Sequence, residues 1–258
     1  MSNRTPLLCC ALIFILMRLS AAVAQNPPRT PTETTREFYT MMREKKYREA
    51  FAMSIYQPAM EGLSAQEFED LRPDFDKMAL ALAEKLPARI DISGEQISGD
   101  MATVFVKVLD ADGKEKIEAA ALIKVSNAWL VGDKESLEMV KKSGKKFFFE
   151  ARITAHHNDV QDMMTRISLA QVFYSQNHNG LFGNMAELIA AGAVPKDIEG
   201  AESTGYRFQI FRSADAKSWY ATAEPVQYGR TGRLSFYLDA SGVRSGDEGG
   251  KPLNIKRN

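Results

Sequence analysis

The first half of the chain changes from a helical to a strand pattern of hydrophobic residues. Between residues 31 and 86, apolar side chains recur every three or four positions, which predicts amphipathic helices. Thr30 to Glu33 and Ser64 to Glu67 have capping-box spacing, so we expect helices to begin there. We expect a break at Lys45 and a kink or split at Pro73, which lacks an N–H group. Four runs rich in β-branched residues then predict antiparallel strands: 89–97, 101–109, 117–125 and 128–131.

The second half also has helices followed by strands, but one of its helices is much longer. Residues 134–142 predict a short linking helix, with a break at Ser143-Gly144. Residues 147–174 carry a helical apolar stripe and predict one helix of about thirty residues. A short helix is expected from Met185 to Val194. Three aromatic-rich strands follow, at 206–211, 219–223 and 234–238. One face of this sheet is expected to lie on the long helix through Phe208, Ile210, Tyr220 and Phe236 or their alternates.

The N-terminus has the pattern of a signal peptide. Arg4 precedes an apolar run from Leu7 to Met17, and Ala22-Val23-Ala24 forms a small-x-small cleavage site. An uncleaved membrane anchor is the alternative, but Arg18 ends the run short of the roughly 20 residues that a spanning helix needs. Lipid attachment is not expected, because Cys9-Cys10 precedes most of the run. We therefore expect export to the periplasm or the exterior, with no stable membrane span after cleavage near Ala24.

These patterns predict an α+β fold with two domains. The first has helices followed by an antiparallel sheet, and the second has a long helix packed on an antiparallel sheet. The predicted divisions are a signal peptide (1–24), a spacer (25–30), a first domain (31–133), a linker (134–146) and a second domain (147–258).

Composition excludes several classes of function. The chain has 33 basic and 33 acidic residues, and cleavage would remove only Arg4 and Arg18, which leaves a net charge of −2. A balanced chain has no general attraction for nucleic acid. Both cysteines would leave with the signal peptide, so the mature chain would have no disulfide, thiol nucleophile or cysteine-based zinc site.

Residues capable of catalysis are scarce. The three histidines are His156, His157 and His178, and the chain lacks the common nucleophile, zinc-protease and nucleotide-binding motifs. Adjacent helical side chains point about 100° apart, so His156 and His157 cannot chelate one ion, and we expect both to face solvent. His178 is expected to cap the end of the long helix. We therefore expect no catalytic activity and no cofactor.

Calcium is the metal ion that the acidic residues near the C-terminus could bind. Asp239, Asp247 and Glu248 are the candidate ligands, because carboxylate oxygens suit this ion. The same residues would also occur in a solvated, glycine-rich tail. Asp110-x-Asp112-Gly113 does not have the spacing of an EF-hand loop, and we interpret it as a turn.

A basic segment meets three consecutive aromatic residues before the long helix. Lys145 and Lys146 precede Phe147, Phe148 and Phe149. Three consecutive helical positions cannot all face one core, so two interpretations stay open. The rings pack a hinge between the domains, or they form a docking patch for an external partner.

Residues 31–133 resemble the nuclear transport factor 2-like cone domains. The resemblance is carried by "TTREFYTMMREKKYREAFAM", "GDMATVFVKV" and "ALIKVSNAWLV". It implies a cone-shaped domain, and ketosteroid isomerase-like relatives with this fold are enzymes that hold a buried acid or base. Tyr39, Asp74 and Asp76 are the possible cone-pocket residues. The other interpretation is that the two aspartates face solvent.

The second half resembles the head domain of type IV pilins and type II secretion pseudopilins. The matching segments, in order, are 165–174 (TRISLAQVFY), 185–194, 205–208 (GYRF), 223–225 (AEP), 229–232 (GRTG), 235–239 (SFYLD) and 241–244 (SGVR). The chain departs from that family because no apolar membrane helix behind a prepilin-peptidase glycine precedes the head, and because it lacks the pilin cysteine pair. The resemblance therefore implies a pilin-type head carried as a soluble domain.

The expected function is that of a non-catalytic exported binding or assembly module. Its expected partners are other envelope proteins, such as pilin or secretion components. The alternative is a small-molecule-binding or enzymatic cone domain with the pilin-like part as a targeting module. A pocket with a shielded carboxylate beside an aromatic ring would favour the alternative, whereas a cone filled with side chains would favour the first function.

Overall fold

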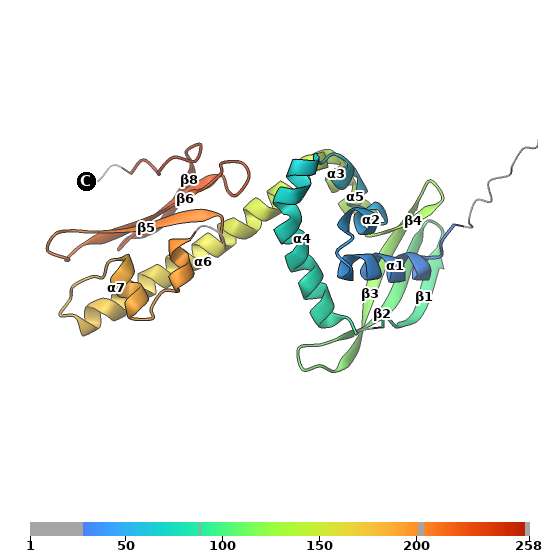
Figure 1. The fold of residues 1–258 in the computed structure, drawn as a ribbon, viewed down its shortest axis with the longest axis horizontal. Helices are drawn as coiled ribbons and strands as arrows, with labels where there is room; N and C mark the ends of the chain where they lie inside the picture. The colour runs from blue at the N-terminus through green and yellow to red at the C-terminus, as the bar shows by residue number, and fades with distance from the viewer. Residues whose placement is uncertain (1–27, 88, 201–203, 256–258) are drawn as a thin grey trace, which may run out of the picture.

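The computed structural model describes residues 28–87, 89–200 and 204–255. The predicted signal peptide and the first part of the spacer lie outside the described residues. Four helices and a sheet form an N-terminal unit, and a long helix with a second sheet forms a C-terminal unit (Figure 1). The predicted α+β class is confirmed.

The N-terminal unit has its helices first and its strands second. The elements are α1 (Pro31–Arg43), α2 (Tyr47–Ala52), α3 (Gln57–Glu61), α4 (Ala65–Lys85), β1 (Ile92–Ser98), β2 (Met101–Leu109), β3 (Glu115–Val125) and β4 (Ala128–Val131). Complete capping boxes start α1 at Thr30 and α4 at Ser64, as predicted. Of the kink or split predicted at Pro73, the split is wrong, because α4 continues through this residue. Leu71 and Phe75 are fully buried on either side, and their burial offsets the roughly 3 kcal/mol that an internal proline costs.

The first sheet is an antiparallel meander with the strand order β1-β2-β3-β4. Along β2, four alternate residues are buried: Ala102, Val104, Val106 and Val108. They share a core with Leu86, Ile90 and Leu122, against which Tyr39 and Leu82 pack. Helices α1 and α4 therefore cover the inner face of this sheet with apolar side chains.

The C-terminal unit packs a long helix against a second antiparallel sheet. Its elements, with the segment that leads into it, are α5 (Lys134–Ser143), the 3-10 helix η1 (Gly144–Lys146), α6 (Phe147–Asn177), α7 (Met185–Ala190), the 3-10 helix η2 (Lys196–Glu199), β5 (Tyr206–Arg212), β6 (Trp219–Pro225), β7 (Leu234–Asp239) and β8 (Gly242–Asp247). The strand order is β5-β6-β7-β8. The predicted order of long helix, short helix and sheet is confirmed, although α7 ends at Ala190 rather than Val194.

Register decides which aromatic side chains face the helix. Phe208 and Phe236 share the buried core with Val160, Met164 and Ile167 of α6. Tyr220 pairs with Phe211 across the strands and lies on the other face, so on β6 it is the alternates of Tyr220 that contact the helix. Trp219, Ala221 and Ala223 face the helix instead. Strand β8 was not predicted as a strand, since Val243 is its only large apolar residue.

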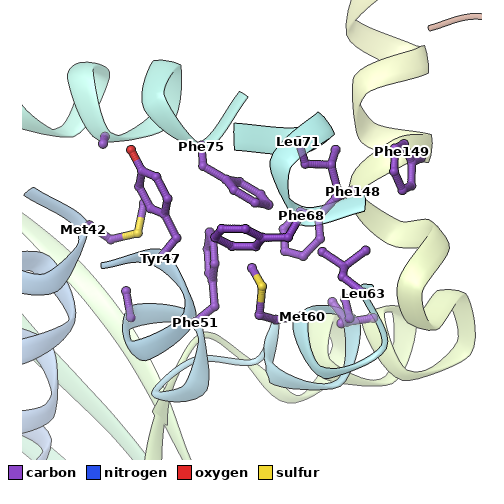
Figure 2. Close-up of a cluster of buried hydrophobic side chains, with 14 of the residues drawn as sticks. Met42, Tyr47, Phe51, Met60, Leu63, Phe68, Leu71, Phe75, Phe148 and Phe149 are labelled. Atoms are coloured by element: carbon purple, nitrogen blue, oxygen red, sulfur yellow. The ribbon is translucent and has the colours of Figure 1, made fainter. Parts of the chain in front are cut away.

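Helix α6 begins inside the core of the N-terminal unit. Phe148 and Phe149 belong to the cluster that contains Phe51, Phe68 and Phe75, and Figure 2 shows Phe148 pointing into it from the long helix while Phe149 lies at its edge. The Phe148 ring centroid lies 5.3 Å from that of Phe51 and 5.1 Å from that of Phe75. The predicted domain boundary before Phe147 therefore cuts across a packed core.

None of the helices among the described residues combines the length and the hydrophobicity that a membrane span requires.

We predict that Phe148→Ala lowers the free energy of unfolding by about 3–5 kcal/mol, because it leaves a cavity among buried rings. Phe173→Ala on the same helix is the control. Phe148 is 6% exposed and Phe173 is 58% exposed, so the control should change stability by less than about 0.5 kcal/mol. Urea unfolding followed by circular dichroism measures both variants. Equal losses would contradict the placement of Phe148 in the core.

Candidate functional site

The candidate site is the joint between the two units, where α4, α6 and the loop of residues 226–233 meet. We call this the ionic joint and define it by Glu67, Asp70 and Asp74 on α4, Lys145 on η1, Arg152 on α6 and Arg230 in the loop. The carboxylates are three and four residues apart, so they lie along one face of α4. Three cations from elsewhere in the chain meet that face.

Arg152 is the buried centre of the ionic joint. It lies one helical turn after Phe148, and its side chain is only 7% exposed. Its guanidinium is 2.6 Å from Asp74 Oδ2 and donates to Asp70 Oδ1 at 3.0 Å. A further N–H group donates to the backbone carbonyl of Asp70. The fork of guanidinium donors can bind both carboxylates and the carbonyl at once, which a lysine could not do in the same geometry.

Arg230 ties the C-terminal sheet to the same helix. Its guanidinium lies 3.2 Å from Asp70 Oδ2 and 3.5 Å from Glu67 Oε1. The same group lies 4.5 Å from the centroid of the Phe149 ring, within cation–π range. Arg152 therefore contacts Asp74 and Asp70, which are 78 and 82 positions away in the sequence. Arg230 contacts Asp70 from 160 positions away.

Glu67 both starts α4 and contributes to the ionic joint. Its Oε2 accepts from the backbone N–H of Ser64 at 3.0 Å, which completes the capping box. Its Oε1 lies 3.3 Å from Lys145 Nζ. The backbone bond from Ser64, together with the Ser64 hydroxyl and Lys145, lowers the pKa of the Glu67 carboxyl. A single carboxylate thus couples helix initiation to contact with the segment leading into α6.

Two histidines hold the loop that carries Arg230. His156 Nδ1 lies 2.8 Å from the carbonyl oxygen of Thr231, so this nitrogen carries the hydrogen and donates. His157 Nε2 accepts from the N–H groups of Arg233 at 3.2 Å and Leu234 at 3.3 Å. Both are half-buried, so the prediction that the pair faces solvent is wrong. Helix α6 lies against the sheet at this point, where the adjacent rings reach different parts of one loop.

Close packing around this loop requires glycine. A Cβ atom on Gly205 would lie 2.7 Å from His156 Nδ1, and its φ of +66° also favours glycine. A Cβ atom on Gly232 would lie 2.0 Å from the Tyr206 hydroxyl, which donates to the carbonyl of Leu234. These contacts position residues 226–233, and with them Arg230, against α6.

The predicted cone-pocket residues do not converge. Tyr39 packs against two of the apolar clusters of the N-terminal unit. Asp74 lies in the ionic joint. Asp76 accepts from the Tyr47 hydroxyl at 2.5 Å and pairs with Lys45 at 3.1 Å. The hydrogen bond from Tyr47, followed by that from Lys45, lowers the pKa of Asp76. The two aspartates therefore neither line one pocket nor stand unpaired in solvent.

The predicted docking residues divide between core and surface. Phe148 and Phe149 are buried and Phe147 packs beside them, so these two buried rings offer no surface to an outside partner. Lys146 is exposed, while Lys145 pairs with Glu67. This arrangement agrees with the interpretation that the rings pack a hinge between the domains, and not with a docking patch for an external partner.

Two of the three calcium candidates, Asp239 and Asp247, lie at opposite ends of the β7–β8 hairpin and have separate partners. Asp239 pairs with Arg244 at 2.5 Å and accepts from Ser241, while Asp247 accepts from Tyr228 at 3.0 Å. Among the described residues, no group of three acidic or histidine side chains is arranged to hold a metal ion. These candidates therefore do not form the proposed site. His178 does act at the end of α6, where its ring bonds to the carbonyl of Tyr174 at 2.7 Å.

The ionic joint is suited to holding surfaces together rather than to catalysis. Its three carboxylates face three cations, so none of them is left as a free base, and the guanidinium groups cannot exchange protons near neutral pH. Sequence reasoning missed Arg152, Asp70 and Arg230. The carboxylate spacing on α4 was a detectable signal, but nothing local identified the cations that would meet it.

Comparisons with known proteins give little further information. No family model matches the chain, and no curated protein sequence matches it. A solved structure, the "Putative NTF2-like transpeptidase" from Campylobacter jejuni, is 18% identical over 41% of this chain and 100% of that chain, with a TM-score of 0.30. That score does not establish a shared fold.

We predict that Arg152→Ala destabilises the protein by up to about 3 kcal/mol, the lower end of the loss for a broken buried pair. The lower end applies because Asp70 and Asp74 are 32% and 30% exposed and can regain water. Lys141→Ala removes an exposed pair with Glu138 and should cost less than about 1 kcal/mol. Urea unfolding distinguishes the two, and an equally small loss in both variants would contradict the role assigned to Arg152.

We predict that acid destabilises the loop contact through His157. Burial, followed by His156 and Arg233, lowers the pKa of His157 from its usual value. The unfolded chain then binds the proton more readily, so stability is complete above about pH 6.5 and falls as the pH decreases below it. Glu150 lies 3.8 Å from Arg233 and completes the charged groups here.

The measurement is the unfolding free energy of wild type and His157→Gln between pH 5 and pH 8. The variant should lose part of the decrease at low pH, since glutamine can accept hydrogen bonds but does not titrate. His178→Gln is the control and should retain the wild-type profile. An unchanged profile in His157→Gln would rule out this residue as a source of the acid sensitivity.

Proposed function

We propose that the protein is a non-catalytic exported assembly module of the cell envelope, in which a fixed joint holds a binding unit at each end of α6. The observation that carries the proposal is the buried Arg152 guanidinium, which bonds to two carboxylates of α4 from within α6. A helix anchored in two cores transmits the position of one unit to the other. That property suits a spacer between partners.

The order of motifs in the second half supports an envelope association. Residues 165–244 resemble pilin and pseudopilin heads, and α6 packs on the second sheet as a pilin-type helix would. The missing membrane segment of a pilin would be replaced by the N-terminal unit. Pilin or secretion components are therefore the partners that we propose.

The alternative, a small-molecule-binding or enzymatic cone, has less support. The inner face of the first sheet packs on apolar residues of α1 and α4, which include Tyr39 and Leu82. The Asp76 carboxylate beside Tyr47 is 39% exposed and paired with Lys45. It is therefore not the shielded carboxylate that the alternative requires.

In-cell cross-linking tests the proposed function. The full chain with a C-terminal tag would be expressed in its own host, and whole cells would be cross-linked before fractionation. We expect a shortened, exported product cross-linked to an envelope protein. We expect Arg152→Ala combined with Arg230→Ala to be exported and folded but to lose most of that cross-link, because the units are no longer held in place.

Lys141→Ala is the matched control for the loss of one exposed cation, and it should retain the cross-link. Circular dichroism of the purified variants would confirm that they are folded. Recovery of an exported wild-type protein without any cross-linked envelope partner would contradict the proposal, as would equal cross-linking of the double variant.

A further inference from the structure

A cavity of about 730 Å³ opens at one end of the second sheet. It lies between the β5–β6 turn (residues 213–218) and the β7–β8 turn (residues 240–241). This end of the sheet is remote from the ionic joint, because β5 starts beside His156 and ends where Arg212 donates to the carbonyl of Phe182, beyond α6. Its size is typical of pockets for small molecules.

Three stacked aromatic rings form one wall of the cavity. The centroids of Phe211 and Tyr220 are 4.6 Å apart, and those of Tyr220 and Tyr237 are 5.4 Å apart, with both pairs within 14° of parallel. All three side chains line the cavity. Phe211 is on the edge strand β5 and is 38% exposed. The stack therefore ends in an accessible ring at the margin of the sheet.

The rest of the cavity wall is polar. Side chains with hydroxyl groups occur on both turns, at Ser213, Ser218 and Ser241. Two of the charged groups already have partners, because Arg212 pairs with Glu187 at 2.6 Å and Asp239 pairs with Arg244 at 2.5 Å.

Lys217 is the third charged residue of this wall, after Arg212 and Asp239. Its ammonium group makes no ion pair with the described residues, although Asp215 lies on the same turn and accepts from the Lys217 backbone N–H. The charged side chains that line the cavity are Arg212, Lys217 and Asp239, which sum to one positive charge, and Asp215 lies outside the lining. An acidic group of a ligand can therefore pair with the Lys217 ammonium group.

We propose that this cavity binds a short saccharide that carries a carboxylate or another acidic substituent. A sugar ring has an apolar face of C–H groups that packs on an aromatic ring, and its edge carries hydroxyls that bond to serine and carboxylate groups. Phe211 offers the ring, the two turns offer the hydroxyls, and Lys217 would pair with the acidic group. The Ser213 and Ser241 hydroxyls already donate to Asp215 and Asp239, but a purely apolar ligand would cover the Lys217 ammonium group without giving it a partner.

The saccharide site depends on the chemistry of the cavity wall and not on the ionic joint, so it is independent of the proposed assembly function. A saccharide site at the end remote from the joint could operate in a free monomer as well as in an assembly.

Intrinsic fluorescence provides a direct binding test. Trp219 lines the cavity and the chain has two tryptophans, so Trp129→Phe leaves Trp219 as the reporter. This protein would be titrated with tetragalacturonate, which is acidic, and with cellotetraose, which is neutral. We expect tetragalacturonate to bind more tightly and to change the Trp219 emission.

Substitutions at the cavity test the assigned contacts. Phe211→Ala should weaken tetragalacturonate binding about tenfold, in line with the loss of one aromatic contact. Lys217→Gln should weaken tetragalacturonate binding while leaving cellotetraose binding unchanged. Tyr228→Ala, at an exposed tyrosine outside the cavity wall, is the control and should bind as the parent does.

Three results would each overturn the proposal: no binding of either probe at millimolar concentrations, equal affinity for both probes, or parental affinity in Phe211→Ala. Because Phe211 is on the surface of an edge strand, this variant is expected to fold, and its thermal unfolding would verify that.

Discussion

The interaction on which the arrangement of the molecule depends is the buried contact of the Arg152 guanidinium with Asp70 and Asp74. Two carboxylates one turn apart on α4 repel each other, and taking an arginine out of water is costly unless its donors are satisfied. The guanidinium reduces the repulsion between the carboxylates, and the carboxylates accept from its donors, but only when α4 and α6 lie together. Phe148 and Phe149 bring α6 to that place through apolar burial. The ion pairs of Arg152 then define the orientation of α6 on α4 more specifically than apolar packing alone would.

The same principle extends from the helix to the second sheet. Arg230 reaches α4 because residues 226–233 are held on α6 by two histidine rings and by the absence of side chains at Gly205 and Gly232. The loop therefore depends on α6, and α6 depends on the N-terminal core. This sequence of contacts links two sheets that do not pair with each other.

Local patterns were sufficient to predict most of the fold. Strand β2 coincides with the predicted run because every second residue from Ala102 to Val108 is apolar. The capping boxes at Thr30 and Ser64 identified two helix starts because their hydrogen bonds span only three residues. The continuation of α4 through Pro73 could not be predicted locally, because it depends on the burial of Leu71 and Phe75 in the tertiary structure. The face occupied by Tyr220 depends on strand register, which the alternating pattern of β6 left open between two choices.

The candidate site could not be predicted in the same way. The partners of Arg152 are 78 and 82 residues away, and no periodicity in a single sequence connects them. His156 and His157 were assigned to solvent because two adjacent side chains cannot serve one metal ion, yet each can serve a different backbone group. The aromatic cavity likewise forms only when two hairpin turns meet at one end of the sheet. The proposed assembly function and the proposed saccharide site thus depend on tertiary placement, at opposite ends of the C-terminal unit.

Whether the ionic joint fixes the two units relative to each other can be tested by measuring the distribution of distances between them. The described residues contain no cysteine, so spin labels can be placed at Ile117→Cys on β3 and Leu169→Cys on α6, both exposed positions. Pulsed electron paramagnetic resonance would then report the distance between the units. If the joint is fixed, the labelled protein gives one narrow distribution, and adding Arg152→Ala and Arg230→Ala makes it broad. A broad distribution in the presence of both arginines would contradict a fixed joint.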